Sequence, residues 1–290
     1  MRAVLVSRFI SLTGTNMTTV ALPWFVLATT GSVTKMGIVL ACQTLPAFAL
    51  GIPGGSVVAL LGCRRSLVLG DAVRAPLLAV VPILQATGHL SFPTLLGLVT
   101  AIGIFSVPYA AAASSLLPEI VGEDEQEVAH AQASLQVAIQ TTGILGPVVA
   151  GALIPLIGAP RLLYLDAASY AISALVIVAF VRAGRAAART GPRRGVLAGL
   201  RQVFTDPLLA SIVTVGLVAH LGLAALFASL PALAFRDFHD PRSAGLLFAS
   251  DAIGSVAGGL LTMRLARRVQ PMRLGIAGFA AMSAPLWLLT

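Results

Sequence analysis

Apolar runs long enough to cross a membrane recur along this sequence and limit the folds that it can adopt. Runs of roughly 18 or more apolar residues alternate with short segments that hold most of the charges, as in polytopic membrane proteins. Charged residues make up only 10% of the chain and its mean hydropathy is +0.94, whereas soluble domains contain about 25% charged residues. The sequence therefore predicts an all-α, polytopic membrane helix bundle.

The apolar runs predict nine membrane helices. The predicted helices are Val4–Thr29, Met36–Leu61, Ser66–Ala86, Phe92–Leu117, Val128–Leu156, Leu162–Val181, Leu208–Ala234, Ser243–Leu265 and Arg273–Leu289. The ninth reaches the last residue without a polar tail, so we expect a bundle that is truncated at its C-terminal end.

Arginines lie mainly on one side of the predicted topology. Because basic residues are retained on the cytoplasmic side of a membrane, this bias predicts a multi-pass protein of the cell membrane with a cytoplasmic N-terminus. The net charge of +8 is spread between apolar spans rather than gathered in one patch, which argues against a nucleic-acid partner. The cytoplasmic set would be Arg2, Arg64, Arg65, Arg182, Arg185, Arg189, Arg193, Arg194, Arg201, Arg264, Arg267, Arg268 and Arg273, against Lys35, Arg161, Arg236 and Arg242 outside.

One long segment without an apolar run divides the chain. Residues 183–206 are rich in Arg, Gly and Ala, which is typical of a cytoplasmic linker between bundles. We therefore expect an N-terminal six-helix bundle at 1–182 and a partial C-terminal bundle of about three helices at 207–290. A glycine pair followed by arginines recurs six helices apart, at residues 54–65 and 258–268. Such a repeated pattern is typical of transporters that are built from parallel repeats.

Two glycine-containing segments match motifs of a known transporter family. The segment that ends the second helix and leads into the third contains Gly55, Gly62, Arg64 and Arg65. It resembles the loop of the major facilitator superfamily with the pattern Gly-x-Leu-Ala-Asp-Arg-x-Gly-Arg-Arg, although Ala and Leu replace the Asp and Arg. In the fifth helix, Gly146, Pro147 and Gly151 resemble the Gly-Pro motif of exporters in that superfamily. Close contact between helices through small residues is the alternative explanation.

Along its whole length the chain looks like the N-terminal three quarters of a major facilitator transporter. Its closer resemblance is to the bacterial branch that contains enterobactin and macrolide exporters. The resemblance implies twelve helices, alternating access between two bundles, a bacterial inner membrane, and export of drug- or siderophore-like amphipathic molecules by proton antiport. Thr15 stands where that branch often has Asp, and the fourth helix lacks the arginine associated with proton coupling. An importer of the same fold and an inactive truncated protein remain alternatives.

Ionisable residues inside membrane spans are candidates for ion pairing or coupling, because an unpaired charge is costly in hydrocarbon. Asp71 and Arg74 are three residues apart on one helix face, so we expect an ion pair that locks the bundle or takes part in switching. Arg8 begins a polar line on the first helix that continues through Ser11, Thr15 and Thr18. Its alternatives are pairing with Asp71 and extension to the cytoplasmic interface.

Two further acids lie in predicted spans. Asp166 is near the outer end of the sixth helix, where water could reach it, so a solvated acid and a coupling group are both open. Asp251 is near the middle of the eighth helix and is the better proton-carrier candidate, because an apolar environment favours a neutral carboxyl group. Structural pairing of Asp251 is the alternative.

Uncharged polar side chains are candidates for a substrate cavity or for hydrogen bonds between helices. Gln132, Gln136 and Gln140 recur every four residues and share one helix face, which should not face lipid. Weaker candidates are Gln43, Tyr109 and His220.

Motifs for catalysis, cofactors and metals are lacking in the sequence. The chain has a single lysine, Lys35, and no glycine-rich phosphate loop around it. Zinc-binding and nucleophile-elbow motifs are also absent, and the two cysteines form no metal-binding pattern. The sequence thus predicts a transporter that needs no cofactor and no metal; its partners are a small-molecule substrate, protons and lipid, and its oligomeric state is left open.

Overall fold

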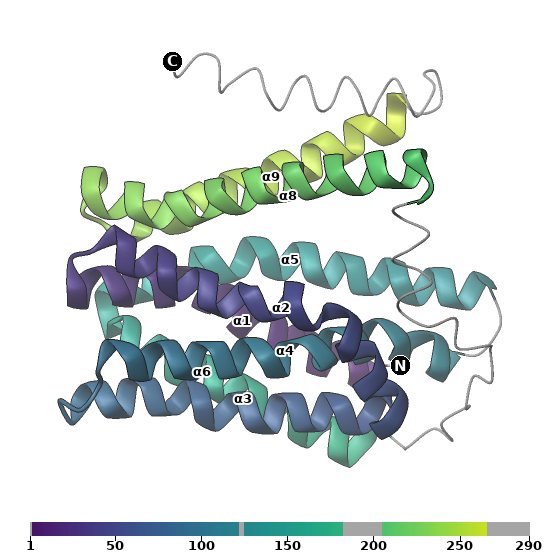
Figure 1. The fold of residues 1–290 in the computed structure, drawn as a ribbon, viewed down its shortest axis with the longest axis horizontal. Helices are drawn as coiled ribbons and strands as arrows, with labels where there is room; N and C mark the ends of the chain where they lie inside the picture. Colours follow the sequence, from purple (N-terminus) through teal and green to yellow (C-terminus); the bar gives the residue numbers. More distant parts are fainter. Residues whose placement is uncertain (1, 122–124, 182–204, 266–290) are drawn as a thin grey trace.

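A computed structural model describes residues 2–121, 125–181 and 205–265, and this part of the chain is helical throughout apart from short connections. In Figure 1 the helices run side by side along the long axis, with α8 and α9 beside α5. The elements are α1 (Arg2–Thr30), α2 (Val33–Leu61), α3 (Cys63–Ala86), α4 (Phe92–Val121), α5 (Glu125–Ile157), α6 (Ala159–Phe180), α8 (Pro207–Leu233), the π-helical turn η1 (Ala234–Phe238) and α9 (Pro241–Leu265).

The all-helical bundle and the first eight predicted helices are confirmed, with small changes at their ends. The predicted helix Arg273–Leu289 and most of the predicted linker lie outside the described residues. The predicted turn after α2 was too long: Gly62 alone separates α2 from α3. Its φ of +82° is a conformation that glycine adopts without strain. Arg64 and Arg65 therefore belong to the first turn of α3 and not to a loop.

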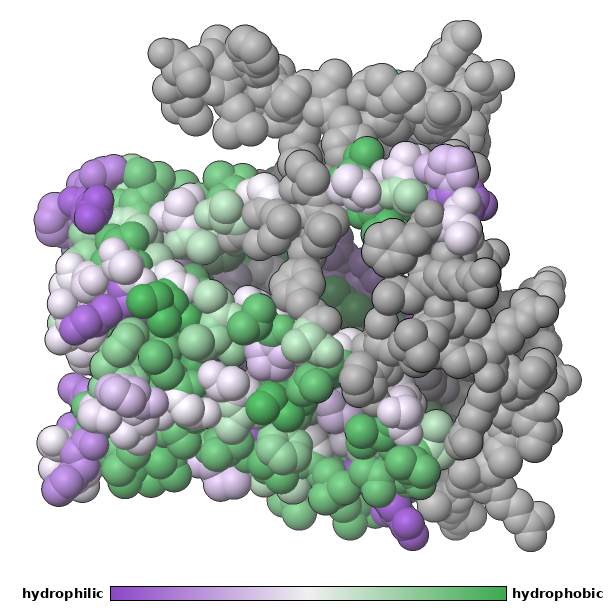
Figure 2. Space-filling model, in the orientation of Figure 1, coloured by the Kyte–Doolittle hydropathy of each residue, from purple (hydrophilic) through white to green (hydrophobic). Residues whose placement is uncertain are grey.

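The outer surface of the helices is apolar. Within the described residues, five helices are long and apolar enough to cross a membrane: the segments Val33–Gly51, Cys63–Ala86, Phe92–Leu116, His130–Ile157 and Ala159–Phe180. Large apolar side chains such as Leu60, Leu156 and Phe180 are exposed. Figure 2 shows that apolar residues cover much of the visible face, with hydrophilic residues near the ends of the helices. This distribution suits a bilayer, whose core offers no water to exposed polar groups.

Helix α1 lies at the centre of the core and packs against both α5 and α6. Its second half is almost completely buried, and Leu22, Phe25 and Leu27 are among the largest fully buried side chains. Leu162 and Leu163 of α6 belong to the same apolar cluster. The first half of α1 carries the polar line predicted from the sequence, and this half is the part that positions the candidate site.

A close contact between α5 and α9 joins the helices after residue 205 to the first six. Gly151 and Gly245 approach so closely that a Cβ added to Gly245 would lie 2.6 Å from the carbonyl oxygen of Pro147. A Cβ on Gly151 would lie 3.0 Å from the carbonyl oxygen of Pro241. Small residues at such positions let helix backbones come together. The division into bundles at 1–182 and 207–290 stays a prediction.

Gly245→Ala should therefore destabilise the protein, because its methyl group forces α5 and α9 apart. We expect a loss of about 1–3 kcal/mol, as for other overpacked sites, measured as a lower melting temperature in detergent. Gly254→Ala is the matched control on the same helix, since nothing lies within 4 Å of its added Cβ. Equal melting temperatures for the two variants would contradict the contact.

Candidate functional site

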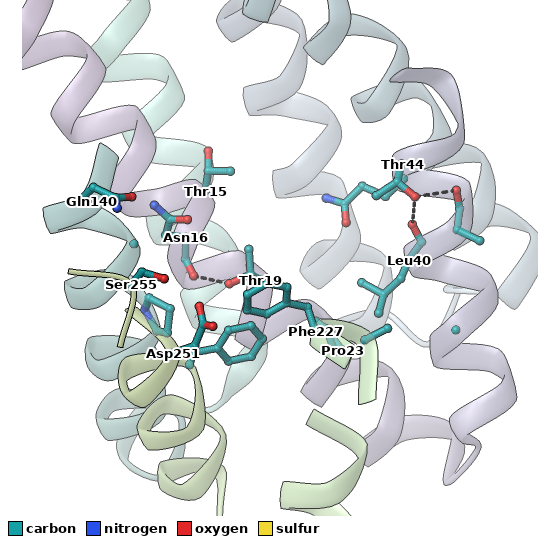
Figure 3. Close-up of a pocket in the computed structure, with 17 residues that line it drawn as sticks. Thr15, Asn16, Thr19, Pro23, Leu40, Thr44, Gln140, Phe227, Asp251 and Ser255 are labelled. Carbon is teal, nitrogen blue, oxygen red and sulfur yellow. Dashed lines mark hydrogen bonds between the residues drawn. The ribbon is translucent and has the colours of Figure 1, made fainter. Parts of the chain in front are cut away.

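A cavity of about 620 Å³ lies between α1, α2, α5, α8 and α9. This volume falls within the range of about 300–1,000 Å³ that is usual for small-molecule sites. In Figure 3, residues of α1, α5 and α9 lie together on one side, and Leu40 and Thr44 of α2 lie on the other. Its lining residues are Thr15, Asn16, Thr19, Pro23, Gly37, Leu40, Ala41, Gln43, Thr44, Gln140, Gly143, Pro147, Phe227, Ala228, Phe248, Asp251 and Ser255.

The cavity wall is mainly apolar, with a few hydroxyl and amide groups and one charged side chain. Among the described lining residues, that charge belongs to Asp251, which points toward the α1 residues in Figure 3. One turn before it on α9, Phe248 stacks on Phe227 of α8, with 5.7 Å between the ring centroids and 9° between the planes. On the α1 side, the Asn16 side chain donates a hydrogen bond of 3.2 Å to Thr142. The cavity thus combines a carboxylate, an aromatic pair and neutral hydrogen-bonding groups.

Only some of the polar residues predicted for a substrate site line this cavity. Gln43 and Gln140 line it, and so does Pro147. Gln132 and Gln136 are exposed on α5 but lie outside this cavity, because they occupy turns of α5 nearer its N-terminal end. The side chain of His220 lies outside the described part of the chain. Sequence reasoning missed Asn16 and Thr19, although their place on the polar part of α1 could have indicated them.

A separate, buried cluster of polar side chains joins α1, α3, α4 and α6. The expected ion pair of Asp71 and Arg74 is present, and both side chains are buried, with 0% and 5% exposed. Ser173 of α6 donates a hydrogen bond of 2.6 Å to the second carboxylate oxygen of Asp71. The hydroxyl of Ser173 also lies 2.8 Å from that of Ser7 on α1. The ion pair of α3 is thereby tied to two other helices.

Two tyrosine rings enclose the guanidinium group of Arg74. Its central carbon lies 4.0 Å from the ring centroid of Tyr109 and 4.3 Å from that of Tyr170. Arg8 lies over the Tyr109 ring as well, at 5.1 Å, rather than in an ion pair with Asp71. Tyr109 is therefore a buried partner of arginines and not a cavity residue, which corrects the expectation from the sequence. Cations held over aromatic faces are stabilised by the ring quadrupole.

The surroundings of Asp166 and Asp251 are the reverse of those that the sequence suggested. Asp166 is completely buried and accepts hydrogen bonds from Thr18, at 2.5 Å, and from Ser169, at 3.1 Å, so it is not a solvated acid. Asp251 is exposed on the cavity wall, so its expected burial is wrong. The reason is helix placement, because α6 lies between α1 and α3, whereas α9, among the described helices, packs mainly against α5. Whether either acid carries a proton stays a prediction.

Thr15 connects the cavity with the buried cluster. It lines the cavity, and its hydroxyl oxygen lies 3.0 Å from that of Tyr170. The Thr15 hydroxyl can also donate to the carbonyl oxygen of Ser11, at 2.9 Å. Either of the two hydroxyls can be the donor in the contact between Thr15 and Tyr170, and Tyr170 is the same residue whose ring lies against Arg74.

Comparisons with known proteins agree with this architecture. Residues 4–290 match the sequence family described as the Major Facilitator Superfamily. The chain belongs to the major facilitator superfamily. It is thus a member of a family of membrane transporters and not of enzymes.

Relatives of this major facilitator protein include exporters at low sequence identity. It is 28% identical over 255 residues to the multidrug efflux pump Tap of Mycolicibacterium fortuitum, covering 85% of this chain and 62% of the pump. The Tap pump of Mycobacterium tuberculosis strain H37Rv is 26% identical over 285 residues, covering 92% of this chain and 66% of the pump. The enterobactin exporter EntS of Citrobacter koseri is 25% identical over 301 residues, covering 99% of this chain and 71% of the exporter.

A solved structure shows the same fold. The bacterial homologue of the human lysosomal transporter Spinster, in an inward-facing and unoccupied conformation, superposes with a TM-score of 0.70 at 16% identity. The match covers 92% of this chain and 62% of that structure. The chain thus spans a little under two thirds of the length of the Tap pumps and of this structure.

The residues of the two family motifs make different contacts in this major facilitator chain. Arg64 donates a hydrogen bond of 2.9 Å from its guanidinium group to the carbonyl oxygen of Val178, which ties the start of α3 to the end of α6. Arg65 and Gly55 are exposed. A Cβ on Gly146 would overlap Asn16, so Gly146 permits the approach of α1 to α5 beside the cavity.

Removal of one partner from the buried ion pair should be strongly destabilising. We expect Asp71→Ala to cost about 3–5 kcal/mol, because Arg74 would be left as a buried charge without its carboxylate. A lower melting temperature and poorer recovery from membranes would report this loss. Asp237→Ala, at an exposed acid of η1, is the control and should leave both unchanged; similar losses in the two variants would exclude a special role of the pair.

Proposed function

We propose that the complete gene product carrying this chain is a secondary active transporter that exports small amphipathic molecules by alternating access, in exchange for protons. The observation that carries the proposal is the drug-sized cavity between the first six helices and α8–α9. Membership of the major facilitator superfamily supports transport, and the Tap and EntS relatives support export. Both bundles are needed for such a cycle, since the cavity forms between them.

The contacts around the cavity support an alternating-access cycle. Beyond the cavity, at the end that holds the α1–α2 and α5–α6 connections, α9 meets α5 through Gly151 and Gly245. At the same end, Phe235 of η1 packs edge-on against Trp24 of α1, with 5.3 Å between ring centroids. With a cytoplasmic N-terminus in a bacterial inner membrane, this is the outer end. The arrangement then corresponds to an outward-closed state, and export requires these contacts to separate.

The chemistry of the cavity favours positively charged substrates. Asp251 is the charged residue among the described lining residues, so the field inside the cavity is negative. The rings of Phe227 and Phe248 add an apolar surface and a face for cation–π contact. Drug-like organic cations fit these features better than anionic siderophores, which are the second candidate because EntS is a relative.

Accumulation of a labelled organic cation in cells tests the direction of transport. Cells that express the complete gene product should retain less tetraphenylphosphonium than cells without it, and the difference should vanish when the proton gradient is dissipated. Higher retention in expressing cells would favour an importer. Equal retention of every probe in a panel of cations, macrolides and siderophores would favour an inactive protein.

Asp251→Asn should weaken binding of cations selectively. We expect about a 10- to 100-fold weaker affinity for tetraphenylphosphonium, because the asparagine lacks the charge that attracts it, with little change for an uncharged ligand of similar size. Equilibrium binding to the purified protein measures both affinities. Asp237→Asn, outside the cavity, is the charge-matched control; an equal effect of both substitutions would rule out direct attraction by Asp251.

A further inference from the structure

The buried cluster contains one carboxylate that no basic group neutralises directly. Asp166 is 0% exposed, and it accepts hydrogen bonds from the hydroxyls of Thr18 and Ser169, with Tyr170 as a further side-chain hydrogen-bond partner. Within the same residues, the ion pair of the cluster joins Arg74 to Asp71 instead. A buried carboxylate without an ion-pair partner in a membrane span is costly, which marks it as functional.

The other charged and titratable groups of the cluster pair mainly with one another and not with Asp166. Arg74 is held by Asp71 and by two tyrosine rings, and Arg8 lies over Tyr109. The described titratable side chains of α5 are about five turns away toward its other end. Arg74 of α3 and Tyr170 of α6 are the charged or titratable groups that act directly on Asp166. Asp71, Tyr109 and Arg8 belong to the same cluster through Arg74 and the Tyr109 ring, while Glu127 and His130 are the distant groups of α5.

The surroundings of Asp166 fit a proton and leave no space for a larger cation. Gly14 of α1 lies directly against it, and a Cβ at Gly14 would overlap both the Asp166 carboxylate and the Ser169 hydroxyl. A metal ion such as calcium needs at least six oxygen ligands around it. In the described residues no group of three or more His, Cys, Asp or Glu side chains is placed to hold a metal.

A line of hydroxyl groups leads from the cavity to this carboxylate. Thr15 lines the cavity and is hydrogen-bonded to Tyr170. Tyr170, one turn after Asp166 on the same face of α6, is in turn a side-chain hydrogen-bond partner of Asp166. Thr18, one turn after Thr15 on α1, donates to Asp166. Any ligand that displaces Thr15, or any shift of α1 against α6, therefore changes the hydrogen bonds at Asp166.

We propose that Asp166 binds the coupling proton of this transporter and that Thr15 and Tyr170 link its protonation to occupancy of the cavity. The inference rests on the proposed function and deepens it, because it assigns different roles to Asp166 and Asp251. Asp251 attracts the substrate at the cavity wall, and Asp166 takes up a proton from water on one side and releases it to water on the other. Both states keep the hydroxyl partners, since a protonated carboxyl group still accepts hydrogen bonds.

Asp166→Asn tests the proposal because asparagine has nearly the same shape and keeps one acceptor oxygen for the neighbouring hydroxyl groups but does not titrate. In proteoliposomes of the complete gene product, tetraphenylphosphonium transport driven by a pH gradient should fall at least about tenfold, within the range of coupling between sites. Exchange of labelled for unlabelled tetraphenylphosphonium without a gradient should persist within about twofold, since no net proton movement is required.

Proton release on ligand binding gives a second readout that does not depend on transport. Addition of tetraphenylphosphonium to the purified wild-type protein in weakly buffered detergent should release protons, and the Asp166→Asn variant should release none. Thr15→Val should reduce this release and Thr15→Ser should restore it, because serine keeps the hydroxyl group. Asp237→Asn should behave as the wild type.

The outcomes separate this inference from the proposed function. Gradient-driven transport and proton release that survive in Asp166→Asn would overturn the assignment while leaving the exporter intact. Loss of gradient-free exchange together with gradient-driven transport would show a structural role for Asp166 and would also overturn it. A wild-type protein that binds the cation without releasing protons would contradict the inference, whereas one that moves no substrate in any assay would contradict the proposed function.

Discussion

The contact between the polar half of α1 and α6 is the interaction on which the rest of the site depends. In a bilayer, polar side chains find their partners in protein, because the hydrocarbon offers none. Ser7, Thr15 and Thr18 meet Ser173, Tyr170 and Asp166 in that order, at matching heights along two helices. This pairing fixes the rotation of both helices, so the neighbouring face of α1, which begins at Thr15, meets the cavity with Asn16 and Thr19.

The same contact explains why the two acids differ. Asp166 lies between α6 and α1 at a place where Gly14 leaves room for its carboxylate and nothing more. Asp251 lies on a helix that is anchored through its first turns, near Gly245, and its own side chain faces the cavity. A carboxylate in the first environment is sealed from ligands and available to a proton, whereas one in the second is available to ligands. Burial by neighbouring helices decides this difference, and depth along a helix does not.

The sequence specified the helices well but not their rotation. Long apolar runs were sufficient to locate α2 and α3, although α3 begins at Cys63 and not at the predicted Ser66. The spacing of Asp71 and Arg74 was sufficient to predict their pair. Tyr109 and Asp251 were placed wrongly because a helix that is apolar on all sides has no strong periodicity to show which face meets protein. The hydroxyl line of α1 was the exception, since its spacing marked one face. Gln132 and Gln136 share a face with Gln140, but a common face does not reveal where along α5 the cavity ends.

Helix α5 joins the cavity to the contact that closes one end of the molecule. Pro147 lines the cavity, and its carbonyl oxygen is the atom nearest to the position of a Cβ on Gly245. Proline within a helix leaves the carbonyl four residues before it without its usual donor, so the helix bends more easily there. A ligand that presses on this wall acts on the segment that touches α9 one turn later at Gly151. One stretch of α5 backbone thus forms both the cavity wall and the contact with α9.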